Sequence, residues 1–181
     1  MIIVIVGPSG SGKTTLINYF RCAIINANII SVDVVSKNRN YLGEVGRNSI
    51  SFDEFKKRRD NNAYTAICSF ESSIYGFALP ESTNKDIYIL DYPGEYPDCK
   101  ELQGYNWIGV LILPPSESIL KSRLTQSNRE YRIPGACVEY SECIEDMRNG
   151  LFDNWIVIKN KTVDNLKDGL KQILQKVKID E

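Results

Sequence analysis

Short apolar runs alternate along the chain with segments whose apolar residues recur at helical spacing. Apolar runs that stop at a glycine or a polar residue are typical of parallel strands covered on both faces. Segments with apolar residues three and four positions apart are typical of helices that pack on such a sheet. The predicted strands are 2–6, 28–31, 87–90, 108–113 and 155–158, and the predicted helices are 13–25, 116–124, 141–147 and 163–177. This alternation predicts an α/β fold with a five-stranded parallel sheet between two layers of helices.

Residues 33–85 depart from this alternation, because they are rich in Asn and Ser and contain no long apolar run. Ser51 and Glu54 have the spacing of a capping box, in which both side chains satisfy free amides at the start of a helix. This spacing predicts a short helix over 52–60, and the residues that follow predict a strand over 63–71. We interpret the whole stretch as a small subdomain inserted into the core.

Residues 125–136 are polar and end at Pro134-Gly135, which predicts a mobile loop that we call the lid. The 181 residues of the chain correspond to the length of one domain. The predicted organisation is therefore a single domain, whose core consists of residues 1–32, 86–124 and 137–181.

The composition narrows the class of function. Hydrophobic residues make up 43% of the chain and charged residues 25%, which is typical of a folded globular protein. The formal net charge of -1 argues against a dedicated nucleic-acid binder, which is usually basic, so no nucleic-acid partner is expected. The absence of histidine from the sequence excludes Ser-His catalytic triads and His-ligated zinc.

The cysteines and the apolar runs indicate where the protein works. The chain has 5 cysteines, none of them in C-x-x-C spacing, which favours reduced thiols in a cytoplasmic protein. The longest apolar run, residues 108–113, is far shorter than the roughly 18 residues of a membrane-spanning helix. The apolar start, residues 1–6, lacks the basic flank and the length of a signal peptide. We therefore expect a cytoplasmic protein without a membrane partner.

Residues Gly7 to Thr14, GPSGSGKT, match the phosphate-loop pattern G-x-x-x-x-G-K-[ST] between a predicted strand and a predicted helix. The glycines let the backbone curl so that successive amides point at phosphate oxygens, and the helix that follows adds the positive end of its dipole. The pattern predicts a P-loop NTPase that binds ATP. The residues expected to contact its phosphates are Gly7, Ser9, Gly10, Ser11, Gly12, Lys13, Thr14 and Thr15.

Three side chains are expected to carry the chemistry at this loop. Lys13 supplies a positive charge to the β and γ phosphates, and the Thr14 hydroxyl is placed to ligate magnesium. Asp91 ends the apolar run 87–90, where a carboxylate that holds Mg²⁺ is found in this class of fold. We therefore expect Lys13 and Asp91 to be catalytic, and Thr14 and Asp91 to be the metal ligands.

Arginines in the irregular parts are candidates for neutralising the charge on a transferred phosphoryl group. Arg39 and Arg47 lie in the insert, and Arg129 and Arg132 lie in the lid. The two lid arginines are the expected catalytic arginines. Arg58 belongs to a basic run on the predicted helix of the insert, and we interpret it as a solvated surface charge.

The chain resembles the guanylate kinases and their relatives among the nucleoside monophosphate kinases. The likeness runs along most of the length and is carried by short matches to the family's motifs. These matches are Gly7 to Leu16, Gly43-Glu44-Val45, Ser51 to Phe55, Tyr75-Gly76, Leu90-Asp91, Pro114-Pro115-Ser116 and Arg123-Leu124. The resemblance implies a three-layer P-loop fold in which residues 33–85 bind a nucleoside monophosphate and the lid carries arginines.

The resemblance also implies an activity, which is transfer of the γ-phosphate of ATP to GMP or dGMP with Mg²⁺ as cofactor. The partners are then ATP and a small phosphorylated acceptor, and the protein is expected to be a monomer or a homodimer. The residues expected to bind the acceptor are Arg39, Glu44, Arg47, Tyr75 and Asp91.

Several positions depart from the family's pattern. The glutamate with which the family reads guanine aligns with Ala66, and the Ser or Thr after its Y-G is Phe77. The second acid of its D-x-D is Pro93, and its lid arginine aligns with Ser127. Polar groups that read a base discriminate strongly between substrates, so their loss leaves the identity of the acceptor open.

Three alternatives therefore stay open. A kinase of the same fold could act on another acceptor such as ribose 1,5-bisphosphate. A guanylate-kinase-like module could bind its ligand with weak catalysis, although the intact Gly12-Lys13-Thr14 argues against it. A GTPase switch is suggested by the D-x-x-G pattern of residues 91–94, but Val163 stands where the guanine-reading N-K-x-D pattern has its acid.

Overall fold

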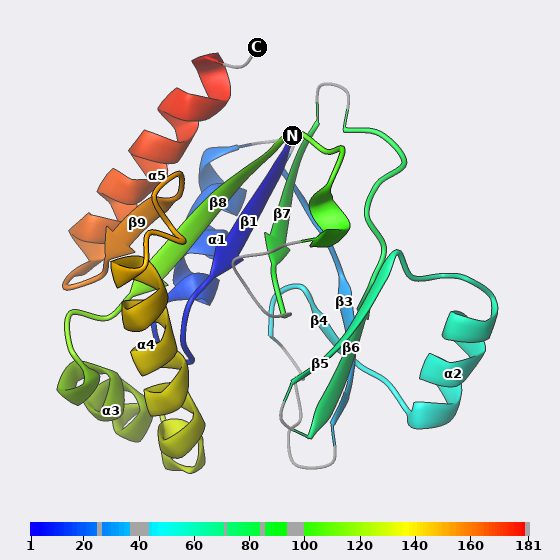
Figure 1. Ribbon diagram of the computed structural model, residues 1–181, viewed down its shortest axis with the longest axis horizontal. Coiled ribbons are helices and arrows are strands. Elements are labelled where there is room, and N and C mark those ends of the chain that lie inside the picture. The colour runs from blue at the N-terminus through cyan, green and yellow to red at the C-terminus, as the bar shows by residue number, and fades with distance from the viewer. Residues whose placement is uncertain (25–26, 37–43, 71, 84–85, 94–99, 180–181) are drawn as a thin grey trace. The chain divides into compact units, whose positions relative to one another are not determined.

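The computed structural model describes residues 1–24, 27–36, 44–70, 72–83, 86–93 and 100–179 (Figure 1). The chain divides into two compact units. Met1–Val4 and Asn26–Trp107 form the first unit, and Ile5–Ile25 and Ile108–Glu181 form the second.

A five-stranded sheet has the strand order β2-β7-β1-β8-β9, and it confirms the predicted five-stranded parallel sheet. β2 pairs in parallel with β7, and β8 pairs in parallel with β9. Every residue of β1 is buried, which explains its unbroken run of β-branched residues. The strands are β1 (Ile2–Val6), β2 (Ala27–Ile29), β7 (Ile87–Asp91), β8 (Trp107–Leu113) and β9 (Ile156–Lys159).

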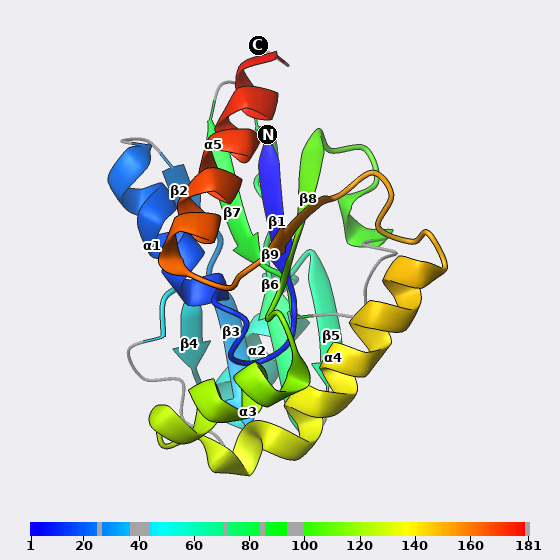
Figure 2. The ribbon, with the colours of Figure 1, turned by 90° about the vertical axis from the view of Figure 1, so that its left-hand side faces the viewer.

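Four helices belong to the second unit. In Figure 2, α1 and α5 lie on one face of β8 and β9, and α4 lies on the other. The start of α3 is fixed by Ser116, whose hydroxyl accepts a hydrogen bond from the amide of Ile119 at 3.3 Å. The helices are α1 (Lys13–Ala23), α3 (Glu117–Gln126), α4 (Ile133–Arg148) and α5 (Val163–Ile179).

The lid contains more regular structure than the sequence predicts. Within 125–136, α3 continues to Gln126, a 3-10 turn spans Glu130–Arg132, and α4 begins at Ile133. The expectation of a loop was wrong there because Pro134 was taken as a helix breaker. Pro134 lies in the first turn of α4, where its missing amide costs no helical hydrogen bond. The predicted helix 141–147 is therefore only the second half of α4.

The first unit also contains a second, four-stranded sheet with the order β4-β3-β6-β5. β3 pairs in parallel with β4 and antiparallel with β6, which in turn pairs antiparallel with β5. Apart from Val32, this sheet lies within the predicted insert, 33–85, but only β5 and the helix α2 were expected. The elements are β3 (Val32–Ser36), β4 (Arg47–Ser49), α2 (Phe52–Asp60), β5 (Ala66–Phe70) and β6 (Ser73–Phe77).

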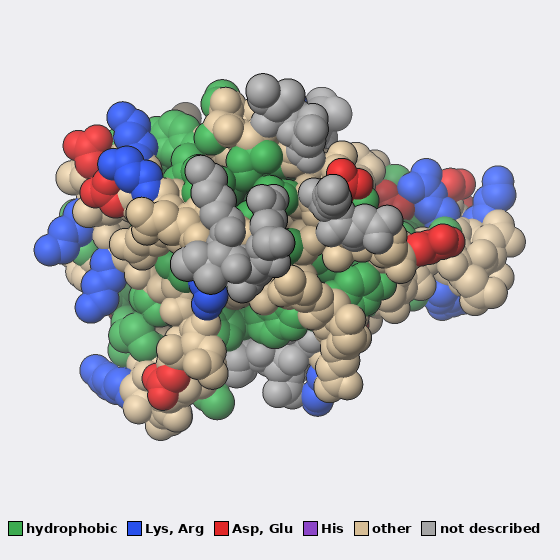
Figure 3. All heavy atoms as spheres, turned by 90° about the horizontal axis from the view of Figure 1, so that it is seen from above, with side chains coloured by type: hydrophobic (Ala, Val, Ile, Leu, Met, Phe, Trp, Pro, Cys, Tyr) green, Lys and Arg blue, Asp and Glu red, His purple; other side chains and the backbone are tan. Residues whose placement is uncertain are grey.

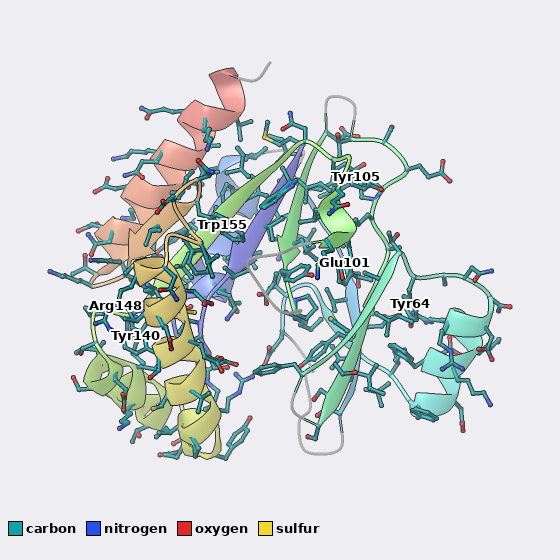
Figure 4. All side chains as sticks on the ribbon, in the orientation of Figure 1. Tyr64, Glu101, Tyr105, Tyr140, Arg148 and Trp155 are labelled. Atoms are coloured by element: carbon teal, nitrogen blue, oxygen red, sulfur yellow. The ribbon has the colours of Figure 1, made fainter. Side chains whose placement is uncertain are left out.

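Helix α2 is held on this sheet by aromatic packing and by a buried carboxylate. Phe55 stacks on Tyr64 with ring centroids 4.9 Å apart, and Tyr64 lies between α2 and the sheet (Figure 4). Asp33 on β3 accepts hydrogen bonds from Arg58 at 2.7 Å and from the Tyr64 hydroxyl at 2.8 Å. Burial and the bond to Asp33 raise the pKa of Tyr64. The interpretation of Arg58 as a solvated charge was wrong, because its guanidinium bridges Glu54 and Asp33.

Only half of the expected capping box forms. The Ser51 hydroxyl accepts a hydrogen bond from the Glu54 amide at 3.1 Å, which fixes the start of α2 at the predicted residue. The Glu54 side chain pairs with Arg58 at 2.8 Å, so it serves the middle of the helix and its attachment to the sheet.

In the described part of the chain, no helix is long and apolar enough to cross a membrane.

Candidate active site

The phosphate loop is a tight curl between β1 and α1 in the second unit. The amide of Ser11 donates to the carbonyl of Pro8 at 3.0 Å and closes a turn. Gly7, Gly10 and Gly12 have φ values of 140°, 82° and 111°, a region that residues with a side chain rarely adopt. The curl that the motif requires is therefore formed by the chain itself.

Asn160, at the end of β9, holds this curl from the outside. Its side-chain amide donates to the carbonyl of Ser11 at 2.7 Å, and its own amide donates to the carbonyl of Leu113 at 2.8 Å. A Cβ atom on Gly12 would collide with the same side-chain amide, so the glycine is required for the close approach. Arg123 donates to the Asn160 carbonyl at 2.8 Å, and its burial lowers the pKa of its guanidinium.

The lysine of the loop is folded back onto the backbone. Lys13 Nζ donates to the carbonyl of Gly7 at 2.5 Å and to that of Pro8 at 3.3 Å. Thr14 and Thr15, in the first turn of α1, are exposed, whereas the Ser11 hydroxyl is buried and has no hydrogen-bond partner. The loop therefore presents an ammonium group and two exposed hydroxyl groups, which are the groups that phosphate and magnesium require.

A carboxylate from α4 also reaches the loop. Glu139 Oε2 accepts a hydrogen bond from the amide of Ser9 at 2.6 Å. Sequence reasoning missed this contact and the role of Asn160. Asn160 had one usable signal, since it is a polar residue at the carboxyl end of a strand, whereas Glu139 is one of several acidic residues on α4 and had none.

A separate cluster of predicted site residues lies in the first unit. Arg47 Nη2 donates to the carbonyl of Asp91 at 2.8 Å and pairs with its Oδ2 at 3.0 Å. The guanidinium also lies 5.6 Å from the ring centre of Tyr75, within the range of a cation–π contact. The side chains of Arg47 and Asp91 are only 7% and 13% exposed. Arg47, Tyr75 and Asp91 therefore form one buried group.

Glu44 begins the turn that leads into this cluster. The amide of Arg47 donates to the carbonyl of Glu44 at 3.2 Å, and Gly46 has a φ of 75°. The carbonyl of Gly46 then accepts from the amide of Val32, which starts the pairing of β3 with β4. Arg39, predicted to bind the acceptor, lies outside the described residues.

Comparison with known proteins agrees with this geometry. No family model matches the sequence. The chain is 31% identical over 133 residues to the guanylate kinase of Bartonella henselae, covering 68% of this chain and 58% of that protein. It is 25% identical to the guanylate kinase of Mycoplasmoides gallisepticum, covering 97% of this chain and 92% of that protein. A crystal structure of guanylate kinase from Anaplasma phagocytophilum superposes with a TM-score of 0.65 at 18% identity, covering 97% of this chain and 85% of that one.

The chain belongs to the guanylate kinase family. It is a phosphotransferase by this membership, and its fold is the P-loop NTPase fold that was predicted. The alignment spans 58% of the length of the first relative and 92% of the second.

Two positions where the family reads guanine are apolar and buried in this guanylate kinase relative. Ala66 on β5 is 6% exposed and lies opposite Phe77 on β6. Phe77 is 1% exposed and packs edge-on against Tyr92, with ring centroids 5.9 Å apart. Neither side chain has a polar group to offer a base, so recognition of the acceptor must rest on other residues.

The lid arginines lie beside the start of α4. Arg129 donates from Nε to the hydroxyl of Ser127 at 2.8 Å, so it is tied to the residue that aligns with the family's lid arginine. Arg132 is the residue immediately before α4 and is half-buried. Both belong to the same unit as the phosphate loop.

The residues predicted to hold magnesium differ in how well they fit it. The Thr14 hydroxyl is exposed in the first turn of α1, where a P-loop ligand of the ion is expected. The Asp91 carboxylate is already neutralised by Arg47, and only its Oδ1 has no hydrogen-bond partner. Among the described residues, no group of three or more acidic or cysteine side chains could hold a metal ion by itself. The fit therefore favours an ion held jointly by Thr14 and the nucleotide's phosphates.

Proposed function

We propose that this protein is an ATP-dependent nucleotide kinase that transfers the γ-phosphate of ATP to a nucleoside monophosphate, with GMP or dGMP as the acceptor. The observation that carries the proposal is the complete phosphate loop, with its three left-handed glycines and its lysine, in a chain related to guanylate kinases. A domain that only bound its ligand would not need the full set of these groups.

The residues divide the work by charge. The loop amides and Lys13 bind the β and γ phosphates of ATP, and Arg129 and Arg132 neutralise the group in transfer. Thr14 would hold Mg²⁺, which when bound supplies charge neutralisation between the phosphates. Asp91, fixed by Arg47, contacts the acceptor. A monophosphate acceptor is already ionised, so the reaction needs no histidine as a general base.

A second candidate is a kinase of the same fold with a different phosphorylated acceptor, such as ribose 1,5-bisphosphate. The observation that favours it is the apolar pair Ala66 and Phe77, which leaves the second sheet without the family's guanine-reading groups. A site built to hydrogen-bond a base rejects other ligands strongly, and its absence relaxes that selection.

The experiment that decides between them is an ADP-release assay with ATP, Mg²⁺ and one acceptor at a time. Acceptors include GMP, dGMP, AMP, CMP, UMP, dTMP and ribose 1,5-bisphosphate. Turnover with GMP or dGMP alone supports the first candidate, and turnover with the sugar phosphate alone supports the second. Silence with every acceptor, despite ATP binding, would indicate a module with weak catalysis.

The location and the assembly of the protein follow as proposals. A cytoplasmic enzyme is supported by Cys22, Cys68 and Cys137, which are free thiols. The face shown in Figure 3 carries basic and acidic side chains interspersed with hydrophobic ones, in line with the net charge of -1. We propose a monomer or a homodimer that works on small phosphorylated ligands.

A further inference from the structure

The amide of Ser9 in the phosphate loop is already bound to an anion, and that anion is a side chain of the protein. Glu139 Oε2 lies 2.6 Å from the Ser9 nitrogen, slightly shorter than the usual range for a hydrogen bond between an N–H group and a charged oxygen, which begins at about 2.7 Å. Hydrogen bonds of this kind are about twice as strong as those between neutral groups. One of the amides of the phosphate loop is therefore already occupied by the Glu139 carboxylate before any ligand binds.

The packing of the second unit delivers Glu139 to this position. Ala136 and Tyr140 on α4 pack against Leu120 and Leu124 on α3. A Cβ atom on Gly10 would lie 3.2 Å from the side chains of the same two leucines, so the loop rests on the same apolar cluster. Glu139 follows Ala136 by three residues, nearly one helical turn, so both lie on the side of α4 that faces this cluster. Ser9 precedes Gly10 in the loop, and the Glu139 carboxylate therefore lies beside the Ser9 amide.

A carboxylate and a phosphate cannot share this amide. The curled loop collects amides that point at one anion, and each amide donates one hydrogen bond. A polyphosphate that enters the curl would meet a like charge at short range in a partly buried place, which is unfavourable. Glu139 must therefore leave the Ser9 amide before a nucleotide can take its place.

We propose that Glu139 sets the nucleotide affinity of the phosphate loop by competing with the phosphates of ATP for the Ser9 amide. This inference rests on the proposed function only in that the loop must bind ATP. When only a fraction of the molecules has the amide free, the apparent dissociation constant rises by the inverse of that fraction. Removing the carboxylate therefore tightens ATP binding, and the residue acts as an internal substitute for the ligand.

The test is the dissociation constant of ATP, measured by calorimetry without any acceptor. The variants are Glu139→Gln, which removes the charge, and Glu139→Ala, which removes both the charge and the hydrogen bond. The matched control is Glu142→Gln, an exposed residue on the same helix whose replacement changes the net charge equally. We expect ATP to bind about tenfold more tightly to both Glu139 variants, and with wild-type affinity to the control.

A second measurement separates competition from a merely structural role. Without nucleotide, both Glu139 variants should unfold at a slightly lower temperature, because the hydrogen bond between α4 and the loop is weakened in Glu139→Gln and lost in Glu139→Ala. A structural role would lower the thermal stability and weaken ATP binding together. Competition predicts opposite signs, with lower stability of the free protein and tighter binding.

The outcomes also distinguish this inference from the proposed function. Equal or weaker ATP binding by Glu139→Gln, in a protein whose wild type binds ATP, overturns the inference and leaves the kinase proposal intact. Tighter binding to the Glu139 variants than to the wild type, together with loss of binding by Lys13→Ala, supports both. If neither the wild type nor the Glu139 variants bind ATP, both the inference and the proposed function are wrong.

Discussion

The two groups of predicted site residues are built in opposite ways. The phosphate loop of the second unit is made of backbone groups that Asn160 holds in place, and two other side chains that contact it, Lys13 and Glu139, can swing away. The cluster of the first unit is made of side chains, and its charged members, Arg47 and Asp91, are almost fully buried against each other. One group is arranged to exchange its partners when a ligand arrives, and the other is arranged to keep them.

This difference shows which charged side chains can change partners when a ligand binds and which cannot. A buried ion pair is costly to break because the remaining charge is left in a place of low polarity. Arg47 is therefore better suited to fix the position of Asp91 than to follow a phosphate. Lys13 is half-buried, and its hydrogen-bond partners among the described residues are carbonyl oxygens, which phosphate oxygens can replace at little cost.

The largest effect is expected from a substitution that breaks the buried ion pair between Arg47 and Asp91. Arg47→Ala should lower the free energy of unfolding by about 3–5 kcal/mol, because Asp91 loses the cation with which it pairs while remaining buried. Urea denaturation measures the change. The control is Arg59→Ala, whose pair with Asp60 is about half exposed and should cost less than about 1 kcal/mol. Equal losses of unfolding free energy in the two variants would mean that the Arg47–Asp91 pair holds its position no more firmly than an exposed ion pair does.

The second effect concerns the exchangeable group. Lys13→Ala should lower the turnover number roughly 10²–10³-fold, because a charge that stabilises the transferred phosphoryl group is lost. The circular dichroism spectrum and the melting temperature should change little, since the hydrogen bonds of Lys13 to the described residues all lie within its own loop. Lys171→Ala, an exposed lysine on α5, serves as the control. Normal turnover by the Lys13 variant would remove the loop from the mechanism.

The third effect tests how the loop keeps its shape. Asn160→Ala leaves the buried Ser11 carbonyl without its donor and should cost about 1–3 kcal/mol of stability. The dissociation constant for ATP should rise about tenfold, because the curl of the loop is then less well fixed. Thermal unfolding and calorimetry measure the two quantities, with the exposed Asn149→Ala as the control. An unchanged affinity would show that the glycines alone determine the curl.

The smallest expected effect is on the reactivity of Cys68, a thiol next to the cluster of Arg47, Tyr75 and Asp91. Cys68 lies opposite Tyr75 in the second sheet, and burial, with a contribution from the Glu101 carboxylate, raises the pKa of its thiol to about 11. A raised pKa keeps the thiol protonated at pH 8, so alkylation by iodoacetamide should be at least about tenfold slower at Cys68 than at the exposed Cys22. Labelling of Cys68 should accelerate as the pH rises toward 11, as measured by peptide mass spectrometry.

The same measurement sharpens the comparison. Arg47 lowers the pKa of the Cys68 thiol, although burial has the larger effect. In the Arg47→Ala variant, alkylation of Cys68 should therefore become slower still, provided that the variant remains folded. Faster labelling there would mean that the second sheet has opened.

The sequence allowed the core to be predicted because its signals are local. A buried strand reads as an apolar run, and the phosphate loop needs glycines at fixed positions whatever surrounds it, so β1, Gly7 to Thr14 and α1 were predicted closely. The start of α2 was predicted for the same reason, since the Ser51 cap acts within one turn.

The features that the sequence did not predict, β3 and two of the site contacts, depend on residues that are distant in the sequence. β3 contains the buried Asp33, which interrupts its apolar pattern and accepts hydrogen bonds from Asn48, Arg58 and Tyr64 elsewhere in the chain. Glu139 reaches Ser9 across 130 positions of sequence, and Arg47 reaches Asp91 across 44. No periodicity or motif in a single sequence specifies such pairs, because the fold alone brings them together.

The indole of Trp155 gives the protein a built-in optical reporter. It covers Gly109 of β8 so closely that a Cβ atom there would collide with the ring, and it meets Phe152 edge-on, just beyond the end of α4 (Figure 4). The chain has only one other tryptophan, Trp107, so a Trp107→Phe variant would emit from Trp155 alone. Its fluorescence would then report on the packing of the indole against β8 and Phe152, without any attached dye.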